Sequence, residues 1–217
     1  PRRAGGGGRR GRWRRQLVAA VTLAVTGATG FVGGHLLDAA GEAGREVRAL
    51  TRRPQARRAG VAWIEGALDD RASLERLCEG ASAVIHVAGV INAPDAAGFD
   101  AGNVAGTRAM IAAARGAGIT RFVHVSSLAA REPQLSLYGA SKGRSEVAVQ
   151  TSGLDWAIVR PPAVYGPGDR ETLELFRMAK RGFVLLPPEG RLSLIHVADL
   201  ARLLLALADP AAPTGLT

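Results

Sequence analysis

Residues 22–34 read TLAVTGATGFVGG, a short apolar run that leads directly into three glycines spaced as G-x-x-G-x-x-G. These glycines are Gly27, Gly30 and Gly33. An apolar run that ends in a glycine turn is typical of a buried strand in a parallel sheet, and the residues beyond the turn are typical of a helix. The stretch therefore predicts the strand, turn and helix that open an α/β fold.

The glycine turn also has the properties of a phosphate-binding site. The first glycine permits the tight turn, the second lets the backbone approach a pyrophosphate, and the third allows the helix to pack closely on the strand. The helix N-terminus contributes unpaired N–H groups and the positive end of the helix dipole. Because the glycines stand in the order that such a site requires, we predict dinucleotide binding; the alternative is an ordinary glycine-rich turn.

Strand-like and helical stretches alternate along the chain as far as residue 160. The expected strands are 23–26, 47–51, 61–64, 83–87, 121–126 and 156–160, and the expected helices are 31–43, 73–79, 102–117 and 140–151. This alternation predicts a Rossmann-type, doubly wound parallel sheet of the α/β class, covered by helices on both faces. Beyond residue 160 we expect helices at 172–180 and 198–208 and short strands at 183–186 and 193–196.

The net charge of +9 is unevenly distributed, because residues 1–15 hold seven arginines and no acid, which leaves +2 for the rest. We interpret residues 1–16 as a disordered basic tail and residues 17–217 as the folded unit. A tail that contacts RNA or a membrane surface is an alternative, but we expect no nucleic-acid partner. Basic residues before an apolar run also resemble a signal peptide, but cleavage there would remove the first strand.

Composition excludes several classes of protein. The single cysteine, Cys78, excludes a disulfide framework, and four scattered histidines form no short-spaced zinc pattern, so no metal site is expected. No apolar run reaches 18 residues, so we expect no transmembrane helix. We therefore expect a cytoplasmic protein.

The end of the second predicted strand indicates which cofactor is bound. An NAD site usually has an acid there to accept hydrogen bonds from the ribose, whereas this chain has Arg52 and Arg53 and no acid. Guanidinium groups suit a 2′-phosphate, so the sequence favours NADP(H) over NAD(H). The alternative is that both arginines are solvated loop residues.

The glycine turn and seven later motifs, in chain order, resemble the extended or atypical branch of the short-chain dehydrogenase/reductase superfamily, which includes epimerase- and dehydratase-like members. The later motifs are GALDD at 66–70, HVAG at 86–89, NVAGT at 103–107, VSS at 125–127, YGASK at 138–142, RPPAVYGP at 160–167 and HVAD at 196–199. Extended members usually continue into a larger C-terminal substrate lobe. The resemblance therefore implies that the lobe of this chain, from about residue 161, is small or truncated.

Tyr138 and Lys142 are four residues apart, which puts both on one face of a helix. A nearby ammonium lowers the pKa of a tyrosine, so we expect Tyr138 to act as a general acid or base. The resemblance implies that Lys142 also binds the nicotinamide ribose, that Asp69 meets the adenine and that Ser127 binds the substrate oxygen. The short interval before Tyr138 leaves Ser126 as an alternative to Ser127. Asn103 either supports the lysine through water or braces a helix against a strand.

The candidate catalytic residues are therefore Ser127, Tyr138 and Lys142. The candidate cofactor-binding residues are Gly27, Thr29, Gly30, Phe31, Val32, Gly33, Arg52, Arg53, Asp69, Ala88, Gly89, Asn103, Tyr138, Lys142, Pro161 and Pro162. We expect an NADP(H)-dependent oxidoreductase that transfers hydride at a carbonyl or alcohol carbon of a small molecule. One alternative is a nucleotide-sugar epimerase or dehydratase, and another is a non-catalytic NADPH-holding subunit of a larger assembly. Whether the protein forms a homodimer is left open.

Overall fold

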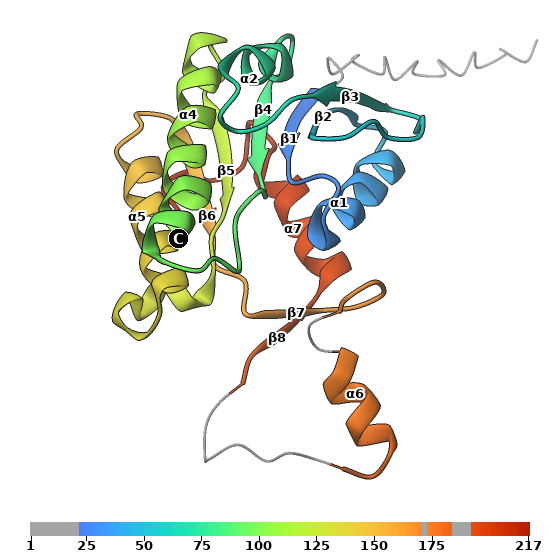
Figure 1. The fold of residues 1–217 in the computed structure, drawn as a ribbon. Helices are drawn as coiled ribbons and strands as arrows, with labels where there is room; N and C mark the ends of the chain where they lie inside the picture. The colour runs from blue at the N-terminus through green and yellow to red at the C-terminus, as the bar shows by residue number, and fades with distance from the viewer. Residues whose placement is uncertain (1–21, 171–172, 184–191) are drawn as a thin grey trace, which may run out of the picture.

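A six-stranded parallel sheet forms the centre of the computed structural model, which describes residues 22–170, 173–183 and 192–217 (Figure 1). Its strands are β1 (Thr22–Thr26), β2 (Glu46–Thr51), β3 (Val61–Glu65), β4 (Ala83–His86), β5 (Arg121–Val125) and β6 (Asp155–Val159). The order β3-β2-β1-β4-β5-β6 is that of a doubly wound sheet, which confirms the predicted fold class. The predicted tail, and all but the first residue of the predicted strand 183–186, lie outside the described residues.

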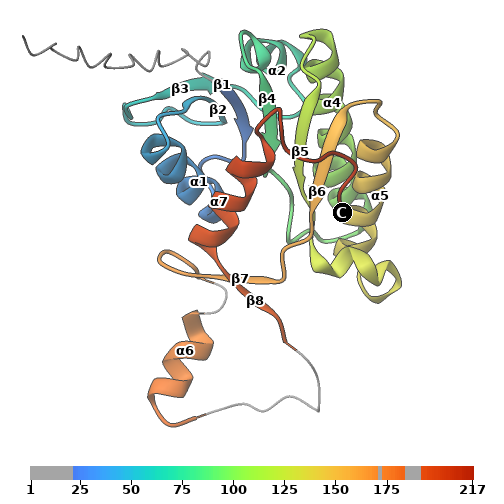
Figure 2. The ribbon, with the colours of Figure 1, turned by 180° about the vertical axis from the view of Figure 1, so that it is seen from behind.

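Helices cover both faces of the sheet (Figures 1 and 2). On one face lie α1 (Phe31–Glu42) and α7 (Val197–Leu207), and on the other lie α2 (Arg71–Cys78), α4 (Gly106–Gly116) and α5 (Leu137–Gln150). Successive residues of β1 point to opposite faces, so Leu23 packs in the core beneath α1 and α7, whereas Ala24 packs in the other core. Burial on both faces explains why the strands read as continuous apolar runs.

A small lobe extends beyond the carboxyl ends of the strands (Figure 1). It contains a parallel pair, β7 (Ala163–Tyr165) and β8 (Leu194–His196), together with α6 (Leu173–Lys180). The helix α6 and the strand β8 were predicted, whereas β7 was not. A lobe from about residue 161 remains our interpretation of this segment.

The predicted helix 102–117 is a composite in the structure. A short α3 (Ala96–Phe99) leads into a π-helical stretch, η1 (Asp100–Ala105), which continues as α4. Two 3₁₀ turns, η2 (Leu128–Arg131) and η3 (Pro133–Leu135), fill the interval between β5 and α5. Within the sheet, β1 is the point where the strand order reverses, and the carboxyl ends of β1 and β4 flank the crevice in which such sheets bind ligands.

Candidate active site

The glycine turn after β1 leaves one side of the backbone open. Gly27 has φ +73°, and a Cβ there would lie 2.6 Å from the amide nitrogen of Ala88. A Cβ on Gly33 would lie 2.1 Å from the carbonyl oxygen of Gly27, so the start of α1 packs directly on the turn. A Cβ on Gly30 would meet only the carbonyl oxygen of Gly27, 3.3 Å away, and no side chain caps α1. These residues therefore fit a pyrophosphate at the N-terminus of α1.

Arg52 and Arg53 follow β2 directly and are both exposed. Within the described part of the chain, neither guanidinium has an ion-pair partner, so both remain available to an anion. Asp69 is exposed in the turn between β3 and α2, whereas Asp70 caps α2 by accepting a hydrogen bond from the Ser73 amide. The structure thus presents the three predicted adenosine-side residues at the carboxyl ends of β2 and β3.

The segment after β4 runs between the glycine turn and α5. The amide of Ala88 donates to the hydroxyl of Thr26, 3.2 Å away, at the end of β1. A Cβ on Gly89 would lie 3.0 Å from Asn103 Oδ1 and 3.6 Å from Lys142 Nζ. The glycine at this position therefore leaves room for both side chains beside the crevice.

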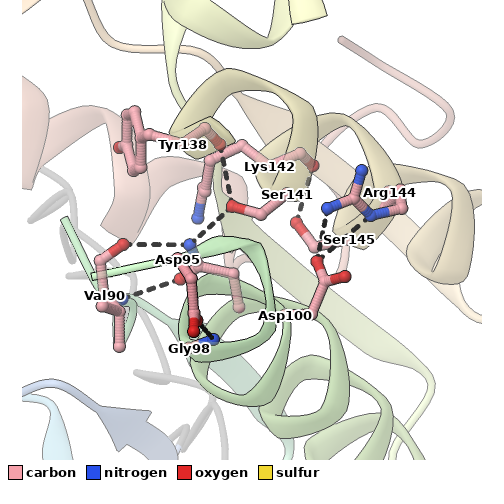
Figure 3. A network of polar contacts seen from close by, with 10 residues as sticks. Val90, Asp95, Gly98, Asp100, Tyr138, Ser141, Lys142, Arg144 and Ser145 are labelled. Carbon is pink, nitrogen blue, oxygen red and sulfur yellow. Dashed lines mark hydrogen bonds and ion pairs between the residues drawn. The ribbon is translucent and has the colours of Figure 1, made fainter. Parts of the chain in front are cut away.

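Asn103, which lies in η1, fastens the segment after β4 to α5. Figure 3 shows its partners, Val90 and Ser141. Its Oδ1 accepts a hydrogen bond from the Val90 amide at 2.7 Å, and its Nδ2 donates to the Val90 carbonyl and to Ser141 Oγ, each at 2.9 Å. Ser141 Oγ in turn donates to the Tyr138 carbonyl at 2.8 Å. The direct contacts of Asn103 are those of a brace, the second of its two predicted roles.

Lys142 is buried, and its Nζ donates to the carbonyl oxygen of Val125, 2.8 Å away at the end of β5. Burial lowers the pKa of Lys142 to about 8, an effect that the nearby carboxylate of Glu146 opposes. Burial also raises the pKa of Tyr138, while a hydrogen bond with the Ser127 side chain acts in the opposite direction. We expected the ammonium to lower the pKa of Tyr138, but in the chain alone burial is the largest effect and the pKa is raised.

The two adjacent serines at the end of β5 have different surroundings. Ser126 is buried and donates a hydrogen bond to the Glu146 carboxylate. Ser127 interacts with Tyr138 and lines a cavity of about 450 Å³. Pro161 and Pro162, predicted to touch the cofactor, line the same cavity. The geometry thus brings Ser127, rather than Ser126, to open space beside Tyr138.

The sequence analysis missed an ion pair between the end of β6 and α5, whose carboxylate is buried. Arg160, at the end of β6, donates to both carboxylate oxygens of Glu146, from Nε at 2.9 Å and from Nη2 at 2.5 Å. The available signal was the position of Glu146, which lies four residues after Lys142 on the same helix face. The pair joins β6 to α5, and Ser126 extends it to β5.

Neither the histidines of the sheet nor the polar residues at the start of α7 line the cavity beside Ser127. His86 and His124 are buried and stacked in the sheet, and burial lowers the pKa of His86 to about 3, so both are core residues. His196 caps α7, and Asp199 pairs with Arg202 on the exposed side of that helix.

Within residues 22–170, 173–183 and 192–217, no group of three or more metal-ligating side chains gathers. Over the same residues, no helix has both the length and the apolar character needed to cross a membrane.

Comparison with known proteins agrees with the fold. Residues 23–215 match the NAD dependent epimerase/dehydratase family. A ceramide reductase of Caulobacter vibrioides is 49% identical over 190 residues, covering 85% of this chain and 60% of the relative. A (4-alkanoyl-5-oxo-2,5-dihydrofuran-3-yl)methyl phosphate reductase of Streptomyces griseus is 36% identical, covering 64% of this chain and 46% of the relative. The solved structure of MoeE5 with UDP-glucose and NAD has a TM-score of 0.77 at 28% identity, covering 90% of this chain and 74% of that one.

Proposed function

This chain belongs to the NAD dependent epimerase/dehydratase family, and we propose that it is an NADP(H)-dependent oxidoreductase of the extended short-chain type. Two of the relatives described above are named reductases. It would reduce a carbonyl carbon to an alcohol, or catalyse the reverse. The chain spans about 60% of the length of its ceramide reductase relative, so the proposal concerns the chemistry of the site that these residues build.

The observation that carries the proposal is the placement of Ser127, Tyr138 and Lys142 at the end of β5, where Ser127 interacts with Tyr138 and Lys142 Nζ donates to the Val125 carbonyl. Ser127 follows β5, and the other two lie in the first turns of α5, where Ser136 caps the helix. The carboxyl ends of the strands are the usual ligand site of this fold, which supports the assignment. Ser127 is suited to donate a hydrogen bond to the substrate oxygen, and Lys142 to donate to a ribose hydroxyl.

The protonation state of Tyr138 is compatible with a role as proton donor. Burial holds the pKa of Tyr138 above its ordinary value, so the phenol keeps its proton at neutral pH. A protonated phenol can donate to the carbonyl oxygen as that oxygen gains negative charge. The bound cofactor would supply hydride to the carbonyl carbon, and the proton from Tyr138 would complete the alcohol.

The preference for NADP(H) is supported by Arg52 and Arg53. Both are exposed at the carboxyl end of β2, where the ribose of a dinucleotide lies in this fold, and neither is engaged in an ion pair within the described residues. Structural relatives bind NAD, as MoeE5 does, so the choice between the two cofactors belongs to this proposal.

The proposal is tested by Tyr138→Phe, with Tyr165→Phe as a matched control. The first change removes only the hydroxyl and keeps the ring near Phe99, with ring centroids 6.1 Å apart in the parent. We expect kcat for NADPH-linked reduction of a panel of ketones to fall by about 10²–10⁴-fold while the Kd for NADPH is unchanged. Tyr165 packs on His196 in the small lobe, and its hydroxyl has no role in this scheme.

Equal rates for Tyr138→Phe and the parent would overturn the catalytic assignment. Tight NADPH binding without turnover of any ketone would instead favour the non-catalytic subunit. Conversion of a sugar nucleotide without net NADPH consumption would favour the epimerase.

A further inference from the structure

The cavity beside Ser127, which we call the leucine groove, is bordered by exposed apolar side chains. Leu128 is 38% exposed, Leu135 77% and Leu192 76%. They come from η2, from η3 and from the segment before β8, so separate parts of the chain present apolar surface to one volume of about 450 Å³. That volume lies within the range of small-molecule sites, about 300–1,000 Å³.

The described residues that line the leucine groove are almost all uncharged. Among the described residues that line it, Glu132 is the only charged one, and it is an acid. Arg160 immediately precedes the groove residue Pro161, but its guanidinium is engaged by both oxygens of Glu146. A nucleotide diphosphate would therefore meet a carboxylate and no available cation among these lining residues, whereas an uncharged chain would meet leucine and proline surfaces.

We propose that the leucine groove binds an alkyl or acyl chain of the substrate, whose carbonyl group lies at Ser127. This inference rests on the proposed function, because it takes Ser127 as the residue that binds the substrate oxygen. Ser127 lines the groove itself, so a carbonyl held there leaves an attached chain beside Leu128 and Leu135. The three exposed leucines are then the surface that substrate binding removes from water.

The test is the chain-length dependence of binding, measured by titration calorimetry with the 217-residue chain. The probes are methyl 3-hydroxybutanoate, 3-hydroxyhexanoate and 3-hydroxyoctanoate, with UDP-glucose as the anionic comparison. Full burial of one methylene is worth about 0.8 kcal/mol, which corresponds to about fourfold in Kd. We expect affinity to rise by up to about fourfold per methylene and every hydroxy ester longer than the butanoate to bind more tightly than UDP-glucose.

Two variants locate the effect. Leu135→Asp and Leu192→Asp change exposed positions, so the fold should survive, and each should flatten the chain-length dependence while leaving binding of the shortest ester unchanged. Leu203→Asp, an exposed leucine on α7 outside the groove, is the matched control and should keep the dependence. A Kd that does not change with chain length, tighter binding of UDP-glucose, or equal flattening by Leu203→Asp would overturn the inference.

The proposed function is tested separately by NADPH oxidation with the corresponding 3-oxo esters. A chain-length dependence of binding with no turnover of any ester would leave the leucine groove standing and count against the reductase. Turnover without a chain-length dependence in either assay would support the reductase and count against the leucine groove.

Discussion

The buried pair of Glu146 and Arg160 gives a prediction whose sign depends on burial. The Glu146 side chain is 4% exposed and that of Arg160 is 30% exposed. The carboxylate accepts two hydrogen bonds from Arg160 and one from Ser126 Oγ. Arg160→Ala would leave a carboxylate with almost no access to water and with the Ser126 hydroxyl as its remaining hydrogen-bond donor among the described residues.

Breaking a buried pair by removing one partner costs about 3–5 kcal/mol, because a charge is left without compensation. We expect this cost for Arg160→Ala. Glu146→Gln removes the charge but keeps an acceptor for Ser126, and the guanidinium that it leaves can reach water. We therefore expect a smaller loss, about 1–3 kcal/mol, for the glutamine variant.

The double variant Glu146→Gln/Arg160→Ala is the decisive measurement. It removes the buried carboxylate that Arg160→Ala leaves without its main partner, so it should be more stable than Arg160→Ala alone, although it carries one more substitution. Urea unfolding at neutral pH gives the free energy of unfolding of the parent, the two single variants and the double variant. The coupling energy between neighbouring residues of this kind is about 0.5–3 kcal/mol.

The control is Arg144→Ala, which breaks the exposed pair with Asp100 and should cost no more than about 1 kcal/mol. A double variant that is less stable than Arg160→Ala would refute the reasoning, because the loss would then not come from an uncompensated charge.

Three further predictions concern the cofactor site and Lys142. Arg52→Ala and Arg53→Ala should each weaken NADPH binding by about 1.5–3 kcal/mol in calorimetry and leave NADH little affected; tighter binding of NADH by the parent would contradict this. Gly33→Ala should lower the free energy of unfolding, measured by thermal denaturation, by about 1–3 kcal/mol through overpacking, whereas Gly34→Ala, with open space around its Cβ, should raise it slightly. The pKa of Lys142 is about 8 in the fold and 10.5 ordinarily, so between these values the unfolded state binds the extra proton and stability rises with pH. Compared with Lys142→Met, the parent should gain about 2–3 kcal/mol between pH 8 and 10 in denaturant titrations, and parallel curves would contradict this.

The fold could be predicted because its signals are local. Each strand of the sheet is a short apolar run. Directly after β1 comes a turn in which Gly27 has φ +73° and a Cβ on Gly33 would lie 2.1 Å from the Gly27 carbonyl oxygen. The small lobe was harder because β7 has three residues, too few to show a period, and its pairing with β8 joins segments about thirty residues apart. The π-helical stretch η1 has no signal of its own, since Asn103 holds it through contacts with Val90 and Ser141.

The site shows where spacing stops being informative. A separation of four residues places Tyr138 and Lys142 on one helix face, but it does not say where a long side chain ends. In the fold, the Lys142 ammonium reaches the Val125 carbonyl, with Glu146 one turn further along α5. The lysine is therefore held by the end of β5, while the pKa of Tyr138 is set by burial and by Ser127. In the chain alone the Tyr138 phenol is therefore protonated at neutral pH, which is the form in which it would donate a proton in the proposed reduction.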